Sequence, residues 1–183
     1  MKAYLTSRTA AVAAAFAILA ALSFTGVAQA ITDTVFRYSA PKTAYFPISG
    51  MAMNASSDNY DYNNGWFTGL SPASGVPCFS TGVNLPHGST ITGLTIWYES
   101  GDVGSGVTAS LYRFQLNDGS FDTIGERTFL NDTNGIRKAG NVPVATSFAT
   151  VNNFQFSYGL GICLETTTFR DARVRYTYNT AGD

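Results

Sequence analysis

Charge is scarce in this sequence of 183 residues, and the little that is present nearly balances. Asp, Glu, Lys and Arg together make up 13% of the chain, with 11 basic and 12 acidic residues. A chain with so little excess charge has no field that would attract the phosphates of nucleic acid or an anionic membrane surface. The composition therefore predicts no nucleic-acid partner.

Metal ligands are equally scarce. The chain holds one histidine, His87, and two cysteines, Cys78 and Cys163, at separations that match no zinc pattern. His87 lies in the sequence LPHG at 85–88, where proline fixes φ for a turn and glycine accepts a positive φ. A general base also needs an orienting partner and a nucleophile within reach, and although Ser89 lies close by, it has no strand-to-helix elbow to strain it. We therefore predict a turn with His87 at its exposed tip, no catalytic residue, no metal and no cofactor.

Only one long apolar run is present, and it lies near the N-terminus. Residues 10–22 are almost all Ala, Val, Phe, Ile or Leu; they follow Lys2 and Arg8 and precede the triplet AQA, which ends at Ala30. This order is typical of a secretory signal peptide cut after Ala30. The run is shorter than the roughly 20 apolar residues that a bilayer span needs, which disfavours the alternative of a membrane anchor.

Removal of this leader, residues 1–30, would leave one domain, Ile31 to Asp183, with a net charge of −3. We expect no membrane insertion after cleavage, and a location in the periplasm, at the cell surface or in the medium of a bacterium. In an oxidising compartment Cys78 and Cys163 are predicted to form a disulfide, with two unpaired thiols as the alternative.

Helical periodicity is missing after the leader, while Thr, Val, Tyr, Phe and Ile are frequent and Gly and Asn punctuate them. We therefore predict an all-β fold, an antiparallel β-sandwich or jelly roll with seven to nine strands. The clearest strand is 154–164, and its core face is expected to hold Phe154, Phe156, Tyr158, Leu160, Ile162 and Leu164. Cys163 would then point to the opposite face, with the segment around Cys78 beside it.

The other predicted strands are 34–38, 45–48, 90–99, 107–116, 121–129 and 172–178. In 90–99 the alternation places Ile91 on the face opposite Leu94. The sequence NDG at 117–119 predicts a hairpin turn, and 131–140 reads as a polar loop.

Residues 56–75 combine polar turn formers with aromatic rings, and are predicted to be a long loop or an excursion with one short strand. Rings that a loop presents can stack on the C–H faces of sugars, while nearby asparagines bond to the hydroxyls. Tyr60, Tyr62 and Trp66, together with Trp97, are therefore our candidate ligand-binding residues. The alternative is that these rings cap or fill the core.

Two sets of charged residues could bind ions. Asp58 and Asp61 lie in the polar stretch, where oxygen ligands could hold calcium, but the spacing fails the EF-hand pattern and a solvated loop is favoured. Arg173 and Arg175 share the outward face of the last strand, which could bind an anion but reads more simply as a solvated sheet face.

Glycoside hydrolysis would need two carboxylates across a groove. Glu99 and Asp102 close one strand end, and Asp118 and Asp122 flank a turn. No paired motif supports either set, so an enzyme is the least favoured reading.

The stretch 83–98 carries a resemblance. Its matching residues are Val83, Leu85, Pro86, Gly88, Ser89, Ile91 and Thr92, in the pattern of a Leu-Pro-x-Gly turn, a small residue and x-Ile-Thr before an alternating strand. In this pattern, in Leu-Tyr-Arg at 111–113 and in the closing strand at 174–178, the chain resembles a group of uncharacterised secreted bacterial β-sandwich proteins. The likeness covers about the last hundred residues and implies the architecture, but no activity.

These observations together predict a non-catalytic secreted β-sandwich protein with a structural or interaction role at the cell surface. The alternative is a carbohydrate-binding module that uses its loop aromatics. A polysaccharide or another surface protein is the expected partner, with self-association as a further option through an unpaired strand edge.

Overall fold

A computed structural model describes residues 36–65 and 69–181 of the chain. The predicted signal peptide, its cleavage point after Ala30 and the side chain of Trp66 lie outside these described residues. The part of the chain that is described contains no helix long and apolar enough to cross a membrane. Its helical turns are two short 3-10 turns, Gly50–Ala52 and Thr146–Phe148.

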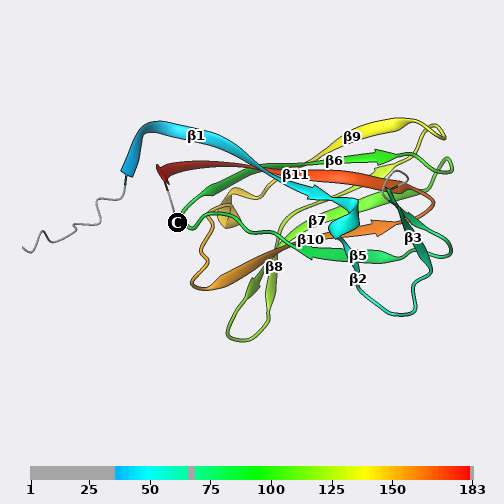
Figure 1. Cartoon of the computed structure of the whole chain (residues 1–183), viewed down its shortest axis with the longest axis horizontal. Coiled ribbons are helices and arrows are strands. Elements are labelled where there is room, and N and C mark those ends of the chain that lie inside the picture. The colour runs from blue at the N-terminus through cyan, green and yellow to red at the C-terminus, as the bar shows by residue number, and fades with distance from the viewer. Residues whose placement is uncertain (1–35, 66–68, 182–183) are drawn as a thin grey trace, which may run out of the picture. The chain divides into compact units, whose positions relative to one another are not determined.

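The fold is an antiparallel β-sandwich, as the alternation predicts (Figure 1). The strands are β1 (Phe36–Ser49), β2 (Asn54–Ala55), β3 (Tyr62–Gly65), β4 (Gly69–Pro72), β5 (Cys78–Gly82), β6 (Thr90–Glu99), β7 (Gly106–Gln115), β8 (Phe121–Leu130), β9 (Arg137–Val142), β10 (Phe156–Leu164) and β11 (Thr168–Ala181). A six-stranded sheet has the order β3-β4-β11-β6-β9, with β1 also paired to β11. A five-stranded sheet has the order β2-β5-β10-β7-β8.

Eight of these strands form a jelly roll. In chain order they are β1 and then β5 to β11, and they pair as β1-β11-β6-β9 in one sheet and β5-β10-β7-β8 in the other. Each sheet thereby joins strands from distant parts of the chain, as in the paired Greek keys of a jelly roll. The short strands β2, β3 and β4 are an insertion between β1 and β5, and they account for the excess over the seven to nine strands predicted.

The core lies between the two sheets. From β10 it takes Tyr158, Leu160, Ile162 and Leu164, all of them buried. The predicted face of this strand is confirmed for these residues, and Phe156 packs against them partly buried. Phe154 is an exception, because its side chain is 83% exposed in the turn before the strand. Asn152 closes that turn: its side chain accepts the N–H of Phe154 at 3.2 Å, and its carbonyl accepts the N–H of Phe156 at 2.9 Å.

A β-bulge in β6 makes the predicted face of Ile91 wrong. Along β11, Arg175 lies opposite Gly93 and the next residue, Tyr176, lies opposite Ile91, so that Thr92 is the extra residue. An extra residue shifts the alternation by one position. Ile91 is therefore buried in the core, with 2% of its surface exposed.

The predicted loop 131–140 is wrong at its end, because Arg137–Val142 forms the edge strand β9, paired to β6. Gly140 and Val142 are its buried positions, which leaves too few apolar side chains for a recognisable alternation. The ring of Phe129 lies against Gly140 and fills the place that a side chain would take.

The first and last strands are longer than predicted. β1 contains the predicted segments 34–38 and 45–48 from Phe36 on, with a register shift against β11 between Arg37 and Lys42. β11 extends the predicted strand 172–178 in both directions, and its outward positions include the two predicted arginines.

Cys78 and Cys163 form the predicted disulfide. The two residues face each other across β5 and β10, with Cα atoms 4.0 Å apart and a sequence separation of 85. Disulfides persist mainly in oxidising compartments, so this bond indicates a protein located outside the cytoplasm.

Candidate functional site

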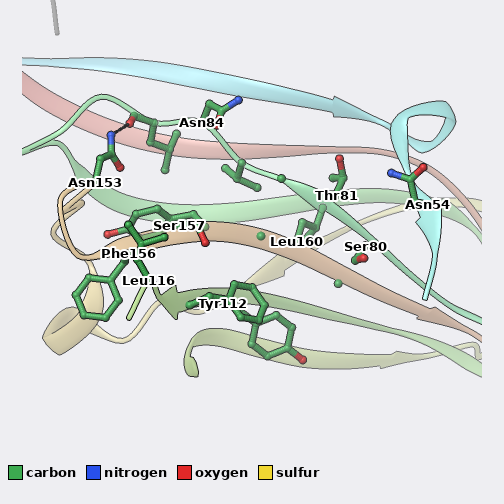
Figure 2. A pocket seen from close by; sticks show the side chains of 17 residues that line it. Asn54, Ser80, Thr81, Asn84, Tyr112, Leu116, Asn153, Phe156, Ser157 and Leu160 are labelled. Atoms are coloured by element: carbon green, nitrogen blue, oxygen red, sulfur yellow. Dashed lines mark hydrogen bonds between the residues drawn. The ribbon is translucent and has the colours of Figure 1, made fainter. Parts of the chain in front are cut away.

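The outer face of the five-stranded sheet holds an open groove of about 800 Å³, which we call the glycine groove (Figure 2). Its walls come from β5, β7 and β10, from Asn54 of β2, from the segment after β5, and from single residues after β7 and before β10. The polar and aromatic residues that line it are Asn54, Ser80, Thr81, Asn84, Tyr112, Phe114, Asn153, Phe156, Ser157 and Tyr158.

Three glycines form the floor of the groove. Gly82 of β5 pairs with Gly159 of β10, and Gly161 follows two residues later on the same outward face. A Cβ atom on Gly82 would have no heavy atom within 4 Å. One on Gly159 would lie 3.2 Å from the Phe114 ring, and one on Gly161 would lie 3.1 Å from the Tyr112 ring. The floor is therefore open at Gly82, while the rings of Phe114 and Tyr112 lie against the other two glycines.

A cluster of aromatic rings forms the wall on the β7 side. The Tyr112 centroid lies 6.0 Å from that of Phe114 and 5.5 Å from that of Phe121, and the two phenylalanines are 6.0 Å apart. Phe114 is 37% exposed and Phe121 is 62% exposed. The rings support one another and still present apolar surface to solvent, as a stacking wall requires.

Amide and hydroxyl groups form the opposite wall, and Asn84 and Asn153 are among the residues that Figure 2 labels there. The Asn153 amide donates to the Leu85 carbonyl at 2.9 Å, which fixes its orientation. No Asp, Glu, Lys, Arg or His lines the groove in the part of the chain that the structure describes. A groove with this lining suits a ligand that has hydroxyl groups and no charge.

His87 is a turn residue, as predicted, but it is less exposed than expected. The N–H of Ser89 donates to the Pro86 carbonyl at 3.1 Å, and the glycine between has a φ of +75°. The His87 Nδ1 atom accepts the backbone N–H of Asn153 at 3.2 Å, and its ring centroid lies 4.5 Å from that of Phe154. These contacts half-bury the imidazole and join its turn to the turn before β10.

The structure separates the predicted ligand-binding aromatics that it describes. Tyr62 of β3 lies edge-on against the buried Phe79, with centroids 4.9 Å apart, so it covers the core. Trp97 lies on β6 in the other sheet, with its ring 5.2 Å from a guanidinium of β11. Tyr60 is partly buried in the turn before β3. No ring contact joins these three among the described residues, and their role in ligand binding stays a prediction.

The acidic residues of the insertion are exposed. Asp58 and Asp61 both lie before β3 with their surfaces open to solvent. Within residues 36–65 and 69–181, no three side chains of His, Cys, Asp or Glu converge as a metal site would require.

Two of the carboxylates weighed for hydrolysis are held in ion pairs. Glu99 accepts from Arg170 at 2.6 Å, and Asp122 accepts from Arg113 at 2.7 Å. Both pairs join neighbouring strands, β6 with β11 and β7 with β8, so these carboxylates contribute to strand pairing.

Sequence reasoning missed the glycine groove, although two signals for it are present. Tyr112 and Phe114 alternate with the buried Leu111 along β7, which places two large rings on an outward face. Gly159 and Gly161 occupy the outward positions of the most apolar strand. Because the pairing of β7 with β10 is not visible in the sequence, the rings and the glycines could not be placed side by side.

No family model matches the chain, and no curated protein is similar to it in sequence. Among solved structures, the chain is similar to the structure of infectious bursal disease virus Gt strain, with 13% identity and a TM-score of 0.43 over 75% of this chain and 32% of that one. The infectious bursal disease virus VP2 subviral particle gives 15% identity and a TM-score of 0.41 over 77% of this chain and 33% of that one. The structure of infectious bursal disease virus Gx strain gives 14% identity and a TM-score of 0.42 over 78% of this chain and 34% of that one. This chain thus spans about a third of the length of these viral chains, and its jelly-roll topology rests on its own strand pairing.

Proposed function

We propose that this protein is a non-catalytic module, secreted to the bacterial cell surface or its surroundings, that binds a neutral polysaccharide in the glycine groove. The lining of the groove carries the proposal, because rings border one side and amides and hydroxyls border the other. A sugar ring has an apolar C–H face and a polar rim, and such a pair of walls matches both. The groove lies open on a sheet face, which suits a polymer that enters and leaves sideways.

The absence of charge from the lining supports binding over hydrolysis. Cleavage of a glycosidic bond needs a carboxylic acid and a second carboxylate on either side of the bond. The described lining offers neither. The signal-like segment 1–30 and the Cys78–Cys163 disulfide support a secreted location.

The test is a pull-down of the purified protein on insoluble neutral polysaccharides such as cellulose, mannan and β-glucan. Phe114→Ala removes part of the ring wall, and Gly82→Leu adds a side chain to the floor at the position where a Cβ atom would have no heavy atom within 4 Å. Each variant should lose about tenfold in affinity, the typical effect of removing a central contact.

Leu130→Ala is the matched control, because Leu130 is 67% exposed on β8 but does not line the groove. This variant should bind as the unmodified protein does. Wild-type affinity in both groove variants, or no binding to any neutral polysaccharide, would overturn the proposal. Far-ultraviolet circular dichroism of each variant separates loss of the site from loss of the fold.

The outer edge of β8 supports a second candidate, association with another copy of the chain or with another surface protein. In the described structure β8 pairs only with β7, and Phe121 and Leu130 near its two ends are 62% and 67% exposed. An unpaired edge can accept a strand from another chain. Sedimentation velocity over a range of concentrations tests this, and a single monomeric species throughout would contradict self-association.

A further inference from the structure

The outer face of the six-stranded sheet holds a second groove, of about 500 Å³, which we call the arginine groove. Arg173 and Arg175 reach it from β11, and Arg127 reaches it from β8, at the edge of the other sheet. Its remaining lining residues are Tyr45, Thr92, Gly93, Leu94, Thr95, Asn141, Val142, Pro143 and Val144.

The arginines of this groove are held in place by groups that leave their charge uncompensated. The Arg175 side chain lies beside Gly93 and donates to the Thr92 hydroxyl at 3.1 Å and the Thr92 carbonyl at 3.2 Å. Arg127 donates to the Asn141 carbonyl at 3.2 Å. A guanidinium carries five N–H donors, so each of these retains donors for another acceptor.

Arg173 lies between two rings. Its guanidinium carbon is 4.4 Å from the Tyr45 centroid and 5.2 Å from the Trp97 centroid. Ring contacts attract the cation without neutralising it, so its N–H donors remain for another acceptor. Tyr45 is itself 49% exposed, so the groove offers an aromatic surface beside the charge.

Arg113 shows what a guanidinium in this setting binds. It also lies between two rings, 4.3 Å from both Phe148 and Phe156, and there a carboxylate completes the arrangement: Asp122 accepts from it at 2.7 Å. Among the described residues, no carboxylate lies within 4.0 Å of Arg127, Arg173 or Arg175. Asp171, two positions before Arg173 on β11, is the nearest acidic residue along that strand.

We propose that the arginine groove binds an acidic polysaccharide through its carboxylate or sulfate groups. Three uncompensated guanidinium groups attract anions and can bind their oxygens in bidentate fashion. The three arginines come from two strands and line an open face, which fits a row of anionic groups on an extended polymer. Tyr45 adds a stacking surface for the sugar ring that carries the anion. The proposal is independent of the neutral ligand assigned to the glycine groove.

The test measures binding of the purified protein to polygalacturonate, which carries carboxylates, and to dextran sulfate, which carries sulfates, with uncharged dextran and inorganic phosphate beside them. Arg173→Gln and Arg175→Gln should each weaken binding to the acidic polymer by about five- to tenfold, because each removes a charge-assisted contact. Raising the salt concentration from about 50 mM to about 300 mM should weaken binding further. Asp171→Asn should strengthen it.

Arg137→Gln is the control, because Arg137 is 80% exposed and lies outside the arginine groove. The affinity of this variant for the acidic polymers should stay within about twofold of that of the unmodified protein, because the removed charge does not contact the ligand. Gly82→Leu should also leave acidic-polymer binding intact, whereas Arg173→Gln should leave neutral-polysaccharide binding intact, so the two proposals fail separately. Wild-type affinity in both groove variants, no binding to either acidic polymer, or inorganic phosphate binding as tightly as the polymers would overturn the assignment.

Discussion

The outer face of the five-stranded sheet carries rings and amides around three glycines. The groove on the outer face of the six-stranded sheet is instead lined by two arginines of β11, by hydroxyl groups, and by Arg127 from the edge of the other sheet. Both faces are the outward half of the same period-two alternation, and the inward half is apolar in each sheet. Core packing constrains the inward half, while the outward half is free to diverge. The binding that we propose for this jelly roll therefore depends on the residues of its outer faces and not on the fold.

Arg113 and Arg173, the two arginines that lie between aromatic rings, also differ in what surrounds their charge. Arg113 has rings on both sides and a carboxylate in front, and its side chain is only 17% exposed. Arg173 has rings on both sides and no carboxylate among the described residues within 4.0 Å. The first arrangement stabilises the end of a hairpin, and the second leaves a cation available for a ligand.

Removing the disulfide should lower the free energy of unfolding more than any of the other substitutions proposed. The structural effect should be greatest at the glycine groove. Replacing Cys78 and Cys163 with alanine removes the covalent link between β5 and β10, the two strands whose glycines form the groove floor. For a separation of 85 residues, loop-closure entropy predicts a loss of about 4.5 kcal/mol in the free energy of unfolding. Urea unfolding of the double variant measures this loss.

Polysaccharide binding by the same double variant compares the outer faces of the two sheets. Affinity for neutral polysaccharide should fall more than affinity for the acidic polymer, because the arginine groove lies on the other sheet. Equal losses at both grooves would contradict the independence of the two faces.

A pair of glycine substitutions should have opposite effects on stability. Gly82→Ala should raise the free energy of unfolding by about 0.5 kcal/mol, because the unfolded chain loses freedom and the new Cβ meets no atom within 4 Å. Gly140→Ala should lower it by about 2 kcal/mol, because its Cβ would lie 2.5 Å from the Phe129 ring. Chemical denaturation measures both, and a destabilising Gly82→Ala would show that the groove floor is not open.

Removing one charge at each ring-flanked arginine, the carboxylate that pairs with Arg113 and the guanidinium of Arg173 itself, should separate their roles. Asp122→Ala leaves the half-buried Arg113 without its carboxylate and should cost about 1.5 kcal/mol of stability. Arg173→Gln should change stability by less than about 0.5 kcal/mol, as exposed substitutions usually do. Thermal unfolding compares the two; an equal cost would show that Arg173 is a structural residue like Arg113.

The fold was predictable because strands with one buried face have alternating apolar and polar residues that can be recognised in the sequence. The alternation in 154–164 and 172–178 identifies β10 and β11, and these strands lie inside their sheets. The misses have local causes. β9 is an edge strand whose inward position at Gly140 is filled by a ring from β8, and the bulge at Thr92 reverses the face of Ile91.

The candidate sites were less predictable, because each depends on strand pairing. Gly159 and Gly161 belong to the groove because β7 pairs with β10 and places the rings of Phe114 and Tyr112 against them. Likewise Arg173 acquires its rings from β1 and β6, on either side of β11. Jelly-roll strands pair with partners far away in the chain, so these neighbours cannot be inferred from spacing along the sequence.

The smallest expected effects concern the acidic residues of two loops that flank β8. The backbone N–H of Ser120 donates to the Asp118 carboxylate at 2.9 Å, and this bond lowers the pKa of Asp118. Lys138 donates to the Asp132 carboxylate and lowers the pKa of Asp132. A carboxyl group whose pKa is lower in the folded state stabilises the fold above the unfolded-state pKa, and this stabilisation is lost as the pH falls through the folded-state pKa.

Asp118→Ala and Asp132→Ala should therefore each lower the melting temperature slightly at about pH 7 and leave it unchanged at about pH 2, where both carboxyls are protonated in either state. Salt should distinguish the two loops. At about 1 M salt the effect of Asp132→Ala should shrink, because the charge of Lys138 is screened, while that of Asp118→Ala should persist, because its partner is a neutral backbone amide. Calorimetric melting at the two pH values and two salt concentrations measures this. A salt-sensitive Asp118 would mean that long-range charge, and not the hydrogen bond in its turn, sets the stability of the hairpin that carries the ring wall.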